Sequence, residues 1–330
     1  MAQVSKKQQH KANVAAMLAV VFVAMFALSF IGLVIMLNDM ADKLAHEEQV
    51  TVGTEAPTDP FYVLLIGSDS RKGTALYTGK ANEHAQVDQH SDVMTLMRID
   101  PATYKITLVT IPRDTVLNGE TNKINDSLSE NDPERVVESI RKLTGADVNH
   151  YMLTTFISFE NLINALGGVD VDVPKTIVVP DPATGKNVTV KAGKNKHLNG
   201  SQALVLARAR KEYGDNGDII RQANVRAIER SLINKMLDAK GNFDVYHVLS
   251  ALEDDTKTSL DLSSMGLLMM EFVEHADEVK IYDCTGPYRG ETRESDGLWV
   301  VPEDASTWST LMAAVDAGED PSGIVEMPKS

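Results

Sequence analysis

The sequence predicts an α/β fold, namely an α/β/α sandwich around a mixed central sheet, preceded by one N-terminal transmembrane helix. Short apolar runs typical of buried strands occur along residues 61–303. They come in mixed order with segments whose apolar residues recur at intervals of three and four, as in amphipathic helices. Such an order favours helices packed on both faces of one sheet. A long uncharged run precedes this region and accounts for the membrane helix.

The first predicted element is the membrane helix, Val14–Leu37, which contains no charged residue. At about 1.5 Å per residue it reaches about 36 Å, enough to span a hydrocarbon core of roughly 30 Å. Lys6, Lys7 and Lys11 precede it and acidic residues follow, so the basic-inside bias places residues 1–13 in the cytoplasm. A cleaved signal peptide is the alternative, but its apolar core is normally about 7 to 15 residues. We therefore expect a single-pass protein of the cell membrane.

The rest of the chain is expected outside the membrane in three parts. Residues 38–60 form a short tether, and residues 61–303 form one domain. Residues 304–330 are acidic and contain Gly and Pro, so they are predicted to form a loose tail. Cys284 is the single cysteine of the chain, so the outer domain has no internal disulfide and depends on its own apolar core.

Three strands are predicted at the start of this domain. Phe61–Ile66 is a compact apolar run that ends at Gly67, and it is typical of a buried strand that delivers its C-terminal loop to a site. Val93–Ile99 and Tyr104–Ile111 follow, and Pro101 lies between them. A proline in so short a connection favours a turn, so these two segments are predicted to form an antiparallel hairpin.

Helices and further strands follow in alternation. Pro133 opens a helix to Leu143 that Gly145 closes, and a second helix runs over Ser158–Leu166. The other expected elements are the strands Val169–Val173 and Val279–Tyr282, the exposed hairpin Ile177–Val179 with Val188–Val190, and the helices Gly200–Ala207, Ile219–Asp238, Val245–Leu252 and Leu262–Ala276.

Arginines gather in one short span, although the formal net charge of the chain is −15. Arg208, Arg210 and Arg221 each offer a planar fork of donors that suits phosphate oxygens. The spacing of Arg208 and Arg210 favours a short extended or turning segment over a smooth helical face. Taken alone, such a cluster is equally well explained as a solvated charge run in salt bridges. The acidic balance argues against nucleic acid as a partner.

Polar residues also follow the predicted strand ends. They form the four patches Gly67–Arg71, Ser91–Asp92, Pro112–Asp114 and Lys123–Asn125. Carboxylates mixed with cationic side chains suit a divalent cation together with a polyanion, because the acids hold Mg²⁺ while the bases hold phosphate. Structural ion pairs would use similar residue types, so each patch has to be weighed together with the others.

A zinc site is the less favoured interpretation of the loop before the second strand. His84, Asp88, His90 and Asp92 have a spacing that could hold a transition metal. The same loop contains Gln and Asn, and solvated side chains explain it better.

Taken in order, the patches resemble the LytR-CpsA-Psr family from about Phe61 to Leu237. The resemblance implies an Mg²⁺-dependent phosphotransferase that moves a glycopolymer from an undecaprenyl pyrophosphate carrier to peptidoglycan or to a surface protein, with accompanying pyrophosphatase activity. The single membrane helix also fits this family. The matching motifs are Leu65–Arg71, Ser91–Asp92, Ile111–Thr115, Lys123–Asn125, Leu166–Asp170, Leu198–Leu204, Ala207–Arg210 and Arg221–Gln222.

The resemblance also implies roles for individual residues. Asp69 and Asp92 would lie at the Mg²⁺ and pyrophosphate, and Asp92 is the candidate base. Arg113 would share in catalysis by neutralising phosphate charge. The expected substrate-binding residues are Arg71, His90, Lys123, Asn125, Arg208, Arg210, Asp215, Arg221 and Gln222.

Two positions depart from the family pattern. His90 and Asp218 stand where the family usually has arginine, and both changes reduce positive charge beside the pyrophosphate. We expect His90 to become protonated beside the phosphates, and Asp218 to turn away or to pair with a neighbouring base. The departures also leave open an alternative function, a catalytically weakened polyprenyl-phosphate-binding or regulatory protein of the cell envelope.

A lipid pyrophosphate needs a charged site next to a dry cavity. We therefore expect an apolar groove whose wall includes the helices over Ile219–Leu237 and Leu262–Val273. Arg113, Arg208 and Arg210 are expected to converge on one anion at the end of that groove.

Overall fold

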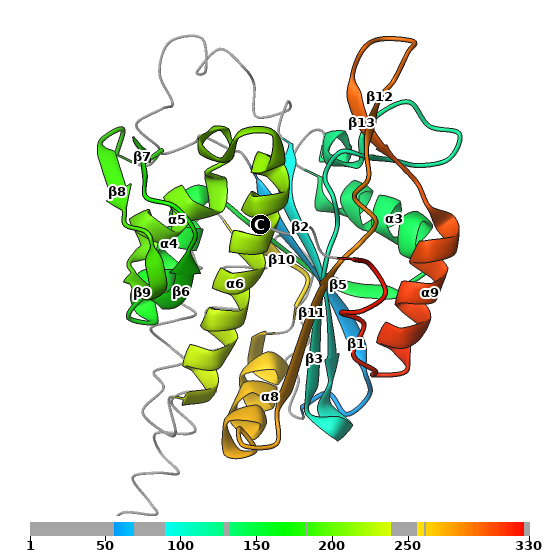
Figure 1. Ribbon diagram of the computed structural model, residues 1–330. Helices are drawn as coiled ribbons and strands as arrows, with labels where there is room; N and C mark the ends of the chain where they lie inside the picture. The colour runs from blue at the N-terminus through cyan, green and yellow to red at the C-terminus, as the bar shows by residue number, and fades with distance from the viewer. Residues whose placement is uncertain are drawn as a thin grey trace, which may run out of the picture.

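Six strands form the central sheet of the computed structural model, which describes residues 56–68, 90–128, 132–182, 184–238, 256–260 and 262–326 (Figure 1). Both parallel and antiparallel pairs occur, so the predicted mixed sheet is confirmed. In sheet order the strands are β10 (Lys257–Thr258), β5 (Val148–Thr154), β1 (Phe61–Ser68), β2 (Ser91–Asp100), β3 (Lys105–Thr110) and β11 (Lys280–Thr285).

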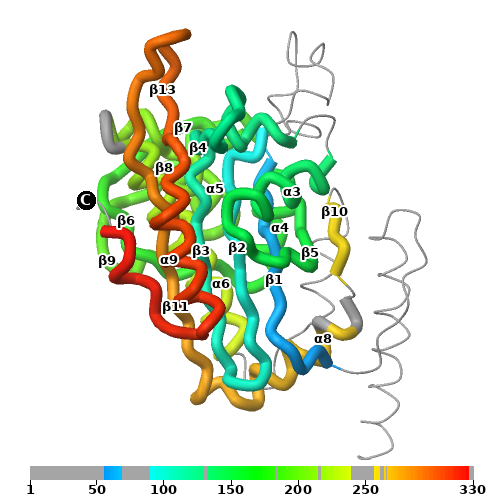
Figure 2. Tube along the Cα trace, turned by 90° about the vertical axis from the view of Figure 1, so that its right-hand side faces the viewer, coloured from blue at the N-terminus to red at the C-terminus, as the bar shows by residue number. Residues whose placement is uncertain are grey.

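Helices cover both faces of this sheet, which confirms the predicted α/β/α sandwich (Figure 1). One face carries α3 (Pro133–Thr144) and α9 (Ala305–Asp316). Figure 2 views the molecule from this side and shows both helices in front of the strands. The opposite side carries α4 (Phe156–Ala165), α5 (Gly200–Arg208), α6 (Gly217–Asp238) and, at its lower end, α8 (Leu262–Glu274).

Short strands and 3-10 turns complete the described part of the chain. The predicted hairpin of β7 and β8 is confirmed, and β6 pairs with β9. A small sheet of β12, β13 and β4 stands at one end of the molecule. The elements are β4 (Thr115–Val116), β6 (Val169–Val173), β7 (Ile177–Pro180), β8 (Asn187–Val190), β9 (Gly193–Leu198), β12 (Glu291–Thr292), β13 (Trp299–Pro302), η1 (Pro101–Thr103), η2 (Ile124–Ser127) and η4 (Lys211–Asn216).

Local chemistry explains the boundaries of the predicted elements. The Asp132 side chain accepts a hydrogen bond from the Glu134 amide and Pro133 occupies the first turn of α3, so the helix begins there. Gly145 ends it with a φ of 70°, a left-handed conformation that glycine adopts without strain. Between β2 and β3 the short η1 turn begins at Pro101, and the antiparallel pairing of the two strands confirms the predicted hairpin.

The alternation of side chains along β1 divides the core between the two faces. Leu64 and Ile66 belong to the cluster that packs against α3 and α9. Phe61 and Val63 point the other way, into the cluster that includes α6 and α8 residues. Because successive strand residues face opposite sides, one strand contributes to both apolar layers.

The prediction of a loose tail over residues 304–330 is wrong. Residues 305–316 form α9, whose first turn is capped by the Asp304 carboxylate. Its buried residues recur at helical intervals and belong to the same core cluster as Leu64. The acidic residues of this segment lie at and beyond the ends of the helix, at Asp304, Asp316, Glu319 and Asp320, so the overall composition hid the apolar stripe between them. The stripe consists of Trp308, Leu311, Met312 and Val315.

No helix within the described ranges is both long and apolar enough to cross a membrane. The predicted membrane helix, residues 14–37, lies outside those ranges, as does most of the tether, residues 38–60. The helix expected over residues 245–252 lies outside them as well.

Candidate active site

The predicted site residues come together because of strand direction. β2 runs antiparallel to β1 and β3, so the start of β2 lies beside the ends of both neighbours. Ser68 at the end of β1 is opposite Ser91, and Thr110 at the end of β3 is opposite Thr95. Asp92 and the Pro112–Asp114 turn therefore meet at one edge of the sheet, as their positions at strand ends predicted.

A cavity of about 630 Å³ opens between this edge and the helices α4, α5 and α6. Most of its wall is apolar, and its charged end carries Asp92 and Arg113 from the sheet edge. The predicted groove beside the arginines is therefore confirmed. Arg208, Arg210 and Arg221 also line it, as do the apolar side chains of Leu65, Val93, Met152, Phe156, Phe159, Leu162, Val179, Leu204, Val205, Val225 and Leu232.

One predicted wall of the groove is wrong. The α8 helix contributes none of the lining residues, because Leu268 and Phe272 pack into the apolar cluster at the other end of the sheet face. The α6 helix does line the cavity, as predicted.

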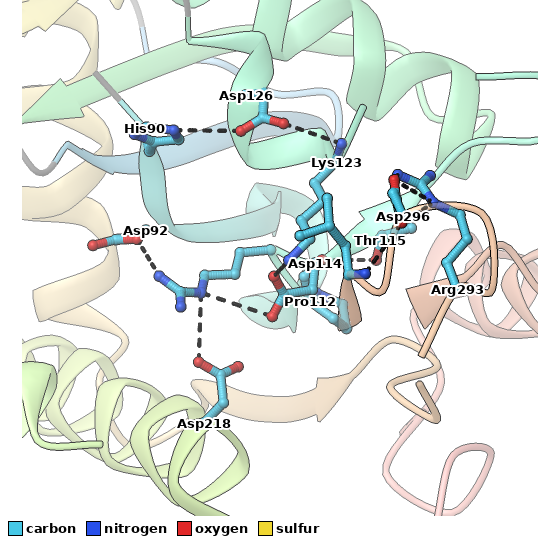
Figure 3. Close-up of polar contacts among 12 residues, drawn as sticks. His90, Asp92, Pro112, Asp114, Thr115, Lys123, Asp126, Asp218, Arg293 and Asp296 are labelled. Carbon is cyan, nitrogen blue, oxygen red and sulfur yellow. Dashed lines mark hydrogen bonds and ion pairs between the residues drawn. The ribbon is translucent and has the colours of Figure 1, made fainter. Parts of the chain in front are cut away.

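Arg113 lies among three carboxylates, those of Asp92, Asp114 and Asp218. Figure 3 labels these three acidic residues. Its Nη1 donates to Asp92 Oδ1, and its Nε lies 3.5 Å from Asp218 Oδ1 and 4.0 Å from Asp114 Oδ2. Burial by itself lowers the pKa of Arg113, but the negative charges of Asp92, Asp218 and Asp114 outweigh it and raise that pKa. The guanidinium stays charged and holds the acidic side chains in place.

Asp218 was expected either to turn away from the anion or to pair with a neighbouring base. The structure shows the second outcome, at the start of α6. Arg221 donates to Asp218 Oδ1 from Nε at 3.1 Å and lies 3.0 Å from it through Nη2, while Gln222 Nε2 donates to Asp218 Oδ2 at 2.8 Å. Residues three and four positions apart lie on one helical face, which explains the contacts. Burial raises the pKa of Asp218, but Arg221 and Arg113 lower it further, so the carboxylate is ionised.

Arg208 and Arg210 stand on a turning segment, as their spacing predicted. Arg208 is the last residue of α5, and Ala209 has extended backbone angles, φ −60° and ψ 117°. The Arg208 guanidinium lies 4.5 Å above the centre of the Phe156 ring, where the π face attracts a cation. Arg113, Arg208 and Arg210 all line the cavity, and their convergence on one anion stays a prediction.

Lys123 and Asn125 were predicted to bind substrate, but they lie behind Arg113 and outside the cavity lining. Lys123 Nζ donates to Asp114 Oδ1 at 2.6 Å, and the Asn125 amide donates to the Arg113 carbonyl at 3.2 Å. These contacts position the loop that carries Arg113. Local sequence places both residues near the site, but the structure puts neither among the residues that line the cavity.

His90 is also outside the cavity lining, and its protonation beside bound phosphates stays a prediction. Its Nε2 lies 3.4 Å from Asp126 Oδ1, and the two side chains are 44% and 42% exposed (Figure 3). The imidazole of His90 therefore has an acidic neighbour on η2 rather than a place among the cavity residues. Gln222 is likewise outside the cavity lining and bonds Asp218 instead.

Three further predicted residues are not described. Asp69 and Arg71 lie outside the described ranges, directly after β1, and so do His84 and Asp88 of the disfavoured zinc interpretation. The backbone of Asp215 belongs to η4, but its side chain is outside the description. Within the described ranges, no group of three His, Cys, Asp or Glu side chains could hold a metal ion.

Three contributors to the site were not singled out from the sequence. Asp114 belongs to the Pro-Arg-Asp patch, so its position did carry a signal. Phe156 gives Arg208 an aromatic surface, and no sequence pattern marks it. Glu229 lines the cavity eight residues after Arg221 on α6, and that helical spacing was the available signal.

Comparison with known proteins identifies the family of the chain. The model of the LytR_cpsA_psr family matches residues 29–312. A curated relative from Bacillus licheniformis, named polyisoprenyl-teichoic acid–peptidoglycan teichoic acid transferase TagU, is 26% identical over 77% of this chain and 76% of its own length.

Solved structures share the fold. Protein gbs0355 from Streptococcus agalactiae has a TM-score of 0.65 and 23% identity, covering 83% of this chain and 92% of that chain. TagV from Bacillus subtilis has a TM-score of 0.62 and 22% identity, covering 80% of this chain and 98% of that chain. Since the family model spans most of the sequence, the chain belongs to the LytR-CpsA-Psr family and is an enzyme, a phosphotransferase.

Proposed function

We propose that this protein transfers a glycopolymer from an undecaprenyl pyrophosphate carrier to peptidoglycan or a surface protein, with Mg²⁺ and with accompanying pyrophosphatase activity. The observation that carries the proposal is an apolar cavity of about 630 Å³ that ends in arginines. A long isoprenoid needs the former and a pyrophosphate the latter. The name of the TagU relative describes a transfer from a polyisoprenyl carrier to peptidoglycan.

The two parts of the donor would occupy different parts of the cavity. The isoprenoid would lie along the apolar wall, and the pyrophosphate would reach Arg208, Arg210 and Arg113 at the charged end. A solved structure of TagT with a ligand named LI-WTA shares this fold, with a TM-score of 0.60.

The reaction forms a bond between the acceptor hydroxyl oxygen and the phosphorus that carries the glycopolymer. The bond from that phosphorus to the lipid phosphate breaks, and the lipid phosphate leaves. Charge spreads over the transferring oxygens in such transition states, so fixed guanidinium groups accelerate the reaction by positioning and charge stabilisation. Asp92 is the proposed acceptor of the hydroxyl proton, since its side chain is about one-third exposed beside Arg113.

The proposed metal is Mg²⁺, held by two carboxylates. This ion usually takes one or two protein carboxylates together with phosphate oxygens. Asp92 lines the cavity, and Asp69 follows Ser68, which also lines it. Asp92 and Asp69 would hold the ion, and when bound it would neutralise phosphate charge.

A second function is favoured by one observation, the pairing of Asp218 with Arg113 and Arg221. The carboxylate neutralises part of the charge that an incoming pyrophosphate would use. A protein that binds polyprenyl phosphate, and regulates envelope assembly without turnover, is the alternative that this pairing supports.

The two functions are separated by an assay of the full chain with a polyprenyl-pyrophosphate-linked saccharide, Mg²⁺ and peptidoglycan. Transfer is expected for the wild type, and Arg113→Ala is expected to reduce turnover by about 10²- to 10³-fold, since it removes a buried charge beside the reacting group. Arg135→Ala is the matched control, because Arg135 is an exposed residue of α3. Binding of the donor without transfer or hydrolysis by the wild type supports the second function.

The proposed place of the reaction is the outer side of the cell membrane, with residues 14–37 as the anchor. Tethering would keep the domain near a donor that is confined to the bilayer. Separation of membrane and soluble fractions, followed by protease treatment of intact cells, tests both the anchoring and the side on which the domain lies.

A further inference from the structure

One face of α6 runs from the charged end of the cavity into its apolar part. Arg221, Val225, Glu229 and Leu232 all line the cavity and recur at intervals of three and four. With a rise of about 1.5 Å per residue, Glu229 lies about 12 Å along the helix from Arg221. A donor whose pyrophosphate contacts Arg221 would therefore place its isoprenoid chain, and not its phosphates, at Glu229.

The Glu229 carboxyl group is poorly suited to carrying a charge in this position. Its Oε2 is buried and has no hydrogen-bond partner among the described residues. Burial raises the pKa of Glu229 to about 7, with the nearby Thr95 hydroxyl and the Arg226 guanidinium opposing the shift and Asp283 adding to it. The charged groups that face it thus come from its own helix and from β11, while β2 supplies the hydroxyl.

Arg226 does not cancel the cost of ionising Glu229, because other groups share its charge. Its Nη1 donates to Thr110 Oγ1 at 3.1 Å, and its Nε lies 3.9 Å from Asp283 Oδ1. Arg226 is 4% exposed, so its guanidinium is held among these partners on β3 and β11. Glu229 is left as an acid at the border between this polar group and the apolar cavity.

We propose that Glu229 is a lipid-contacting residue that must be a neutral acid when the isoprenoid is bound, so that binding of the donor takes up one proton. This inference rests on the proposed function, since it places the isoprenoid in the cavity. An apolar chain that fills the cavity displaces water from the carboxyl group, which disfavours its ionised form. The bound state consequently selects protonated Glu229.

The direction of the pH dependence follows from this selection. In the free protein Glu229 is mostly protonated below about pH 7 and mostly ionised above it. Lipid affinity is then full below pH 7 and falls as the pH rises, because each binding event must first protonate the carboxylate. Between pH 6 and pH 8 the expected loss is about tenfold.

Isothermal titration calorimetry of the full chain tests the proposal. The probe is the methylene-bisphosphonate analogue of geranylgeranyl pyrophosphate, which cannot be hydrolysed between its phosphorus atoms. Methylene bisphosphonate alone measures the protons taken up by the head group. Titrations in buffers of different ionisation enthalpy give the number of protons bound.

The wild type is expected to take up about one more proton per lipid probe at pH 8 than Glu229→Gln, whose side chain cannot ionise. Glu229→Gln should also lack the tenfold loss of affinity between pH 6 and pH 8. Glu274→Gln, an exposed change on α8, should behave as the wild type does. The head group alone should show no difference among the three proteins.

Equal proton uptake and equal pH dependence in wild type and Glu229→Gln would overturn this proposal while leaving the proposed function intact. Failure of the wild type to bind the lipid probe at every pH from 6 to 8 would overturn both. If the probe binds and the wild type differs from Glu229→Gln in proton uptake and in pH dependence, both this proposal and the proposed function are supported.

Discussion

The two faces of the central sheet receive alternate side chains from the same strands, yet one face is closely packed and the other borders a cavity. On the α3 and α9 face, Leu64, Leu96 and Trp308 are 0–1% exposed and fill a continuous core. On the α4 to α6 side, Leu65 and Val93 border a cavity. Strand alternation thus allows one sheet to provide a filled core on one side and the wall of a cavity on the other.

Polar contacts differ between the faces in the same way. On the filled face they connect the end of α9 to the sheet. Tyr62 Oη donates to Asp316 Oδ1 at 2.5 Å, and Arg98 Nη2 donates to the Asp316 carbonyl at 3.2 Å. On the cavity face, charged groups gather at one end around Arg113 and Asp218. The first set connects helix and sheet, whereas the second places charged side chains beside an apolar cavity.

The largest expected effect is on the filled face. Trp308→Ala should lower the free energy of unfolding by about 3–5 kcal/mol, since a buried aromatic residue is removed from a close-packed core. Gly286 leaves room for this ring, because a Cβ there would lie 2.1 Å from Trp308 Cη2. Trp299→Ala is the matched control: Trp299 is 52% exposed, so a change within about 0.5 kcal/mol is expected. Denaturant titration measures both, and equal losses would contradict the division of faces.

Adjacent leucines on β1 provide a sharper comparison. Leu64→Ala should destabilise the protein by about 3 kcal/mol, because it opens a void in the filled core. Leu65→Ala should cost less, since its side chain already borders a cavity, but it should weaken binding of a lipid donor analogue. Unfolding and ligand titrations of both variants test this. The comparison fails if Leu64→Ala alone changes lipid affinity.

Asp218 tests the charged end of the cavity. Asp218→Asn removes a carboxylate that competes for Arg113 and Arg221, so binding of a pyrophosphate analogue should tighten by about tenfold, or about 1.4 kcal/mol. Asp218→Arg should act in the same direction. Asp296→Asn, an exposed partner of Arg293, should leave the affinity unchanged. An unchanged affinity in both Asp218 variants would show that Asp218 does not compete with the anion.

The smallest expected effect is the loss of one hydroxyl on the filled face. Tyr62→Phe should lower stability by about 1 kcal/mol, since Asp316 loses a hydrogen-bond donor. Burial and the Asp316 contact also raise the pKa of Tyr62, so the hydroxyl remains a donor throughout the neutral range. Tyr288→Phe removes an exposed hydroxyl contact and should cost less. Thermal unfolding compares the two variants. Equal losses of stability would show that the Tyr62–Asp316 hydrogen bond does not hold α9 against the sheet.

Much of the fold could be predicted because its signals are local. Apolar runs identified β1, β2 and β3, and Pro101 identified the turn between the last two. Pro133 and Gly145 marked the limits of α3. The two-residue strands β4, β10 and β12 were missed, because such short strands have no periodicity and form only where a partner is already placed.

Part of the site was also predictable from positions at strand ends. Asp92 and Arg113 were placed together correctly, and the spacing of Arg208 and Arg210 indicated a turning segment. Side-chain direction could not be predicted in the same way. His90 faces Asp126 and Lys123 faces Asp114, because these contacts depend on how η2 packs against the start of β2.

The sequence by itself determined the α/β/α class, the main elements, the arginine-rich character of the site and the family resemblance, because periodicity, capping residues and motif spacing are properties of neighbouring positions. Only the tertiary structure decided three further features: the docking of α9 into the core, the cavity with Glu229 in its wall, and the pairing of Asp218 with Arg113. Each joins segments far apart in the chain, and contacts of that kind depend on packing and shared burial, which no local pattern encodes.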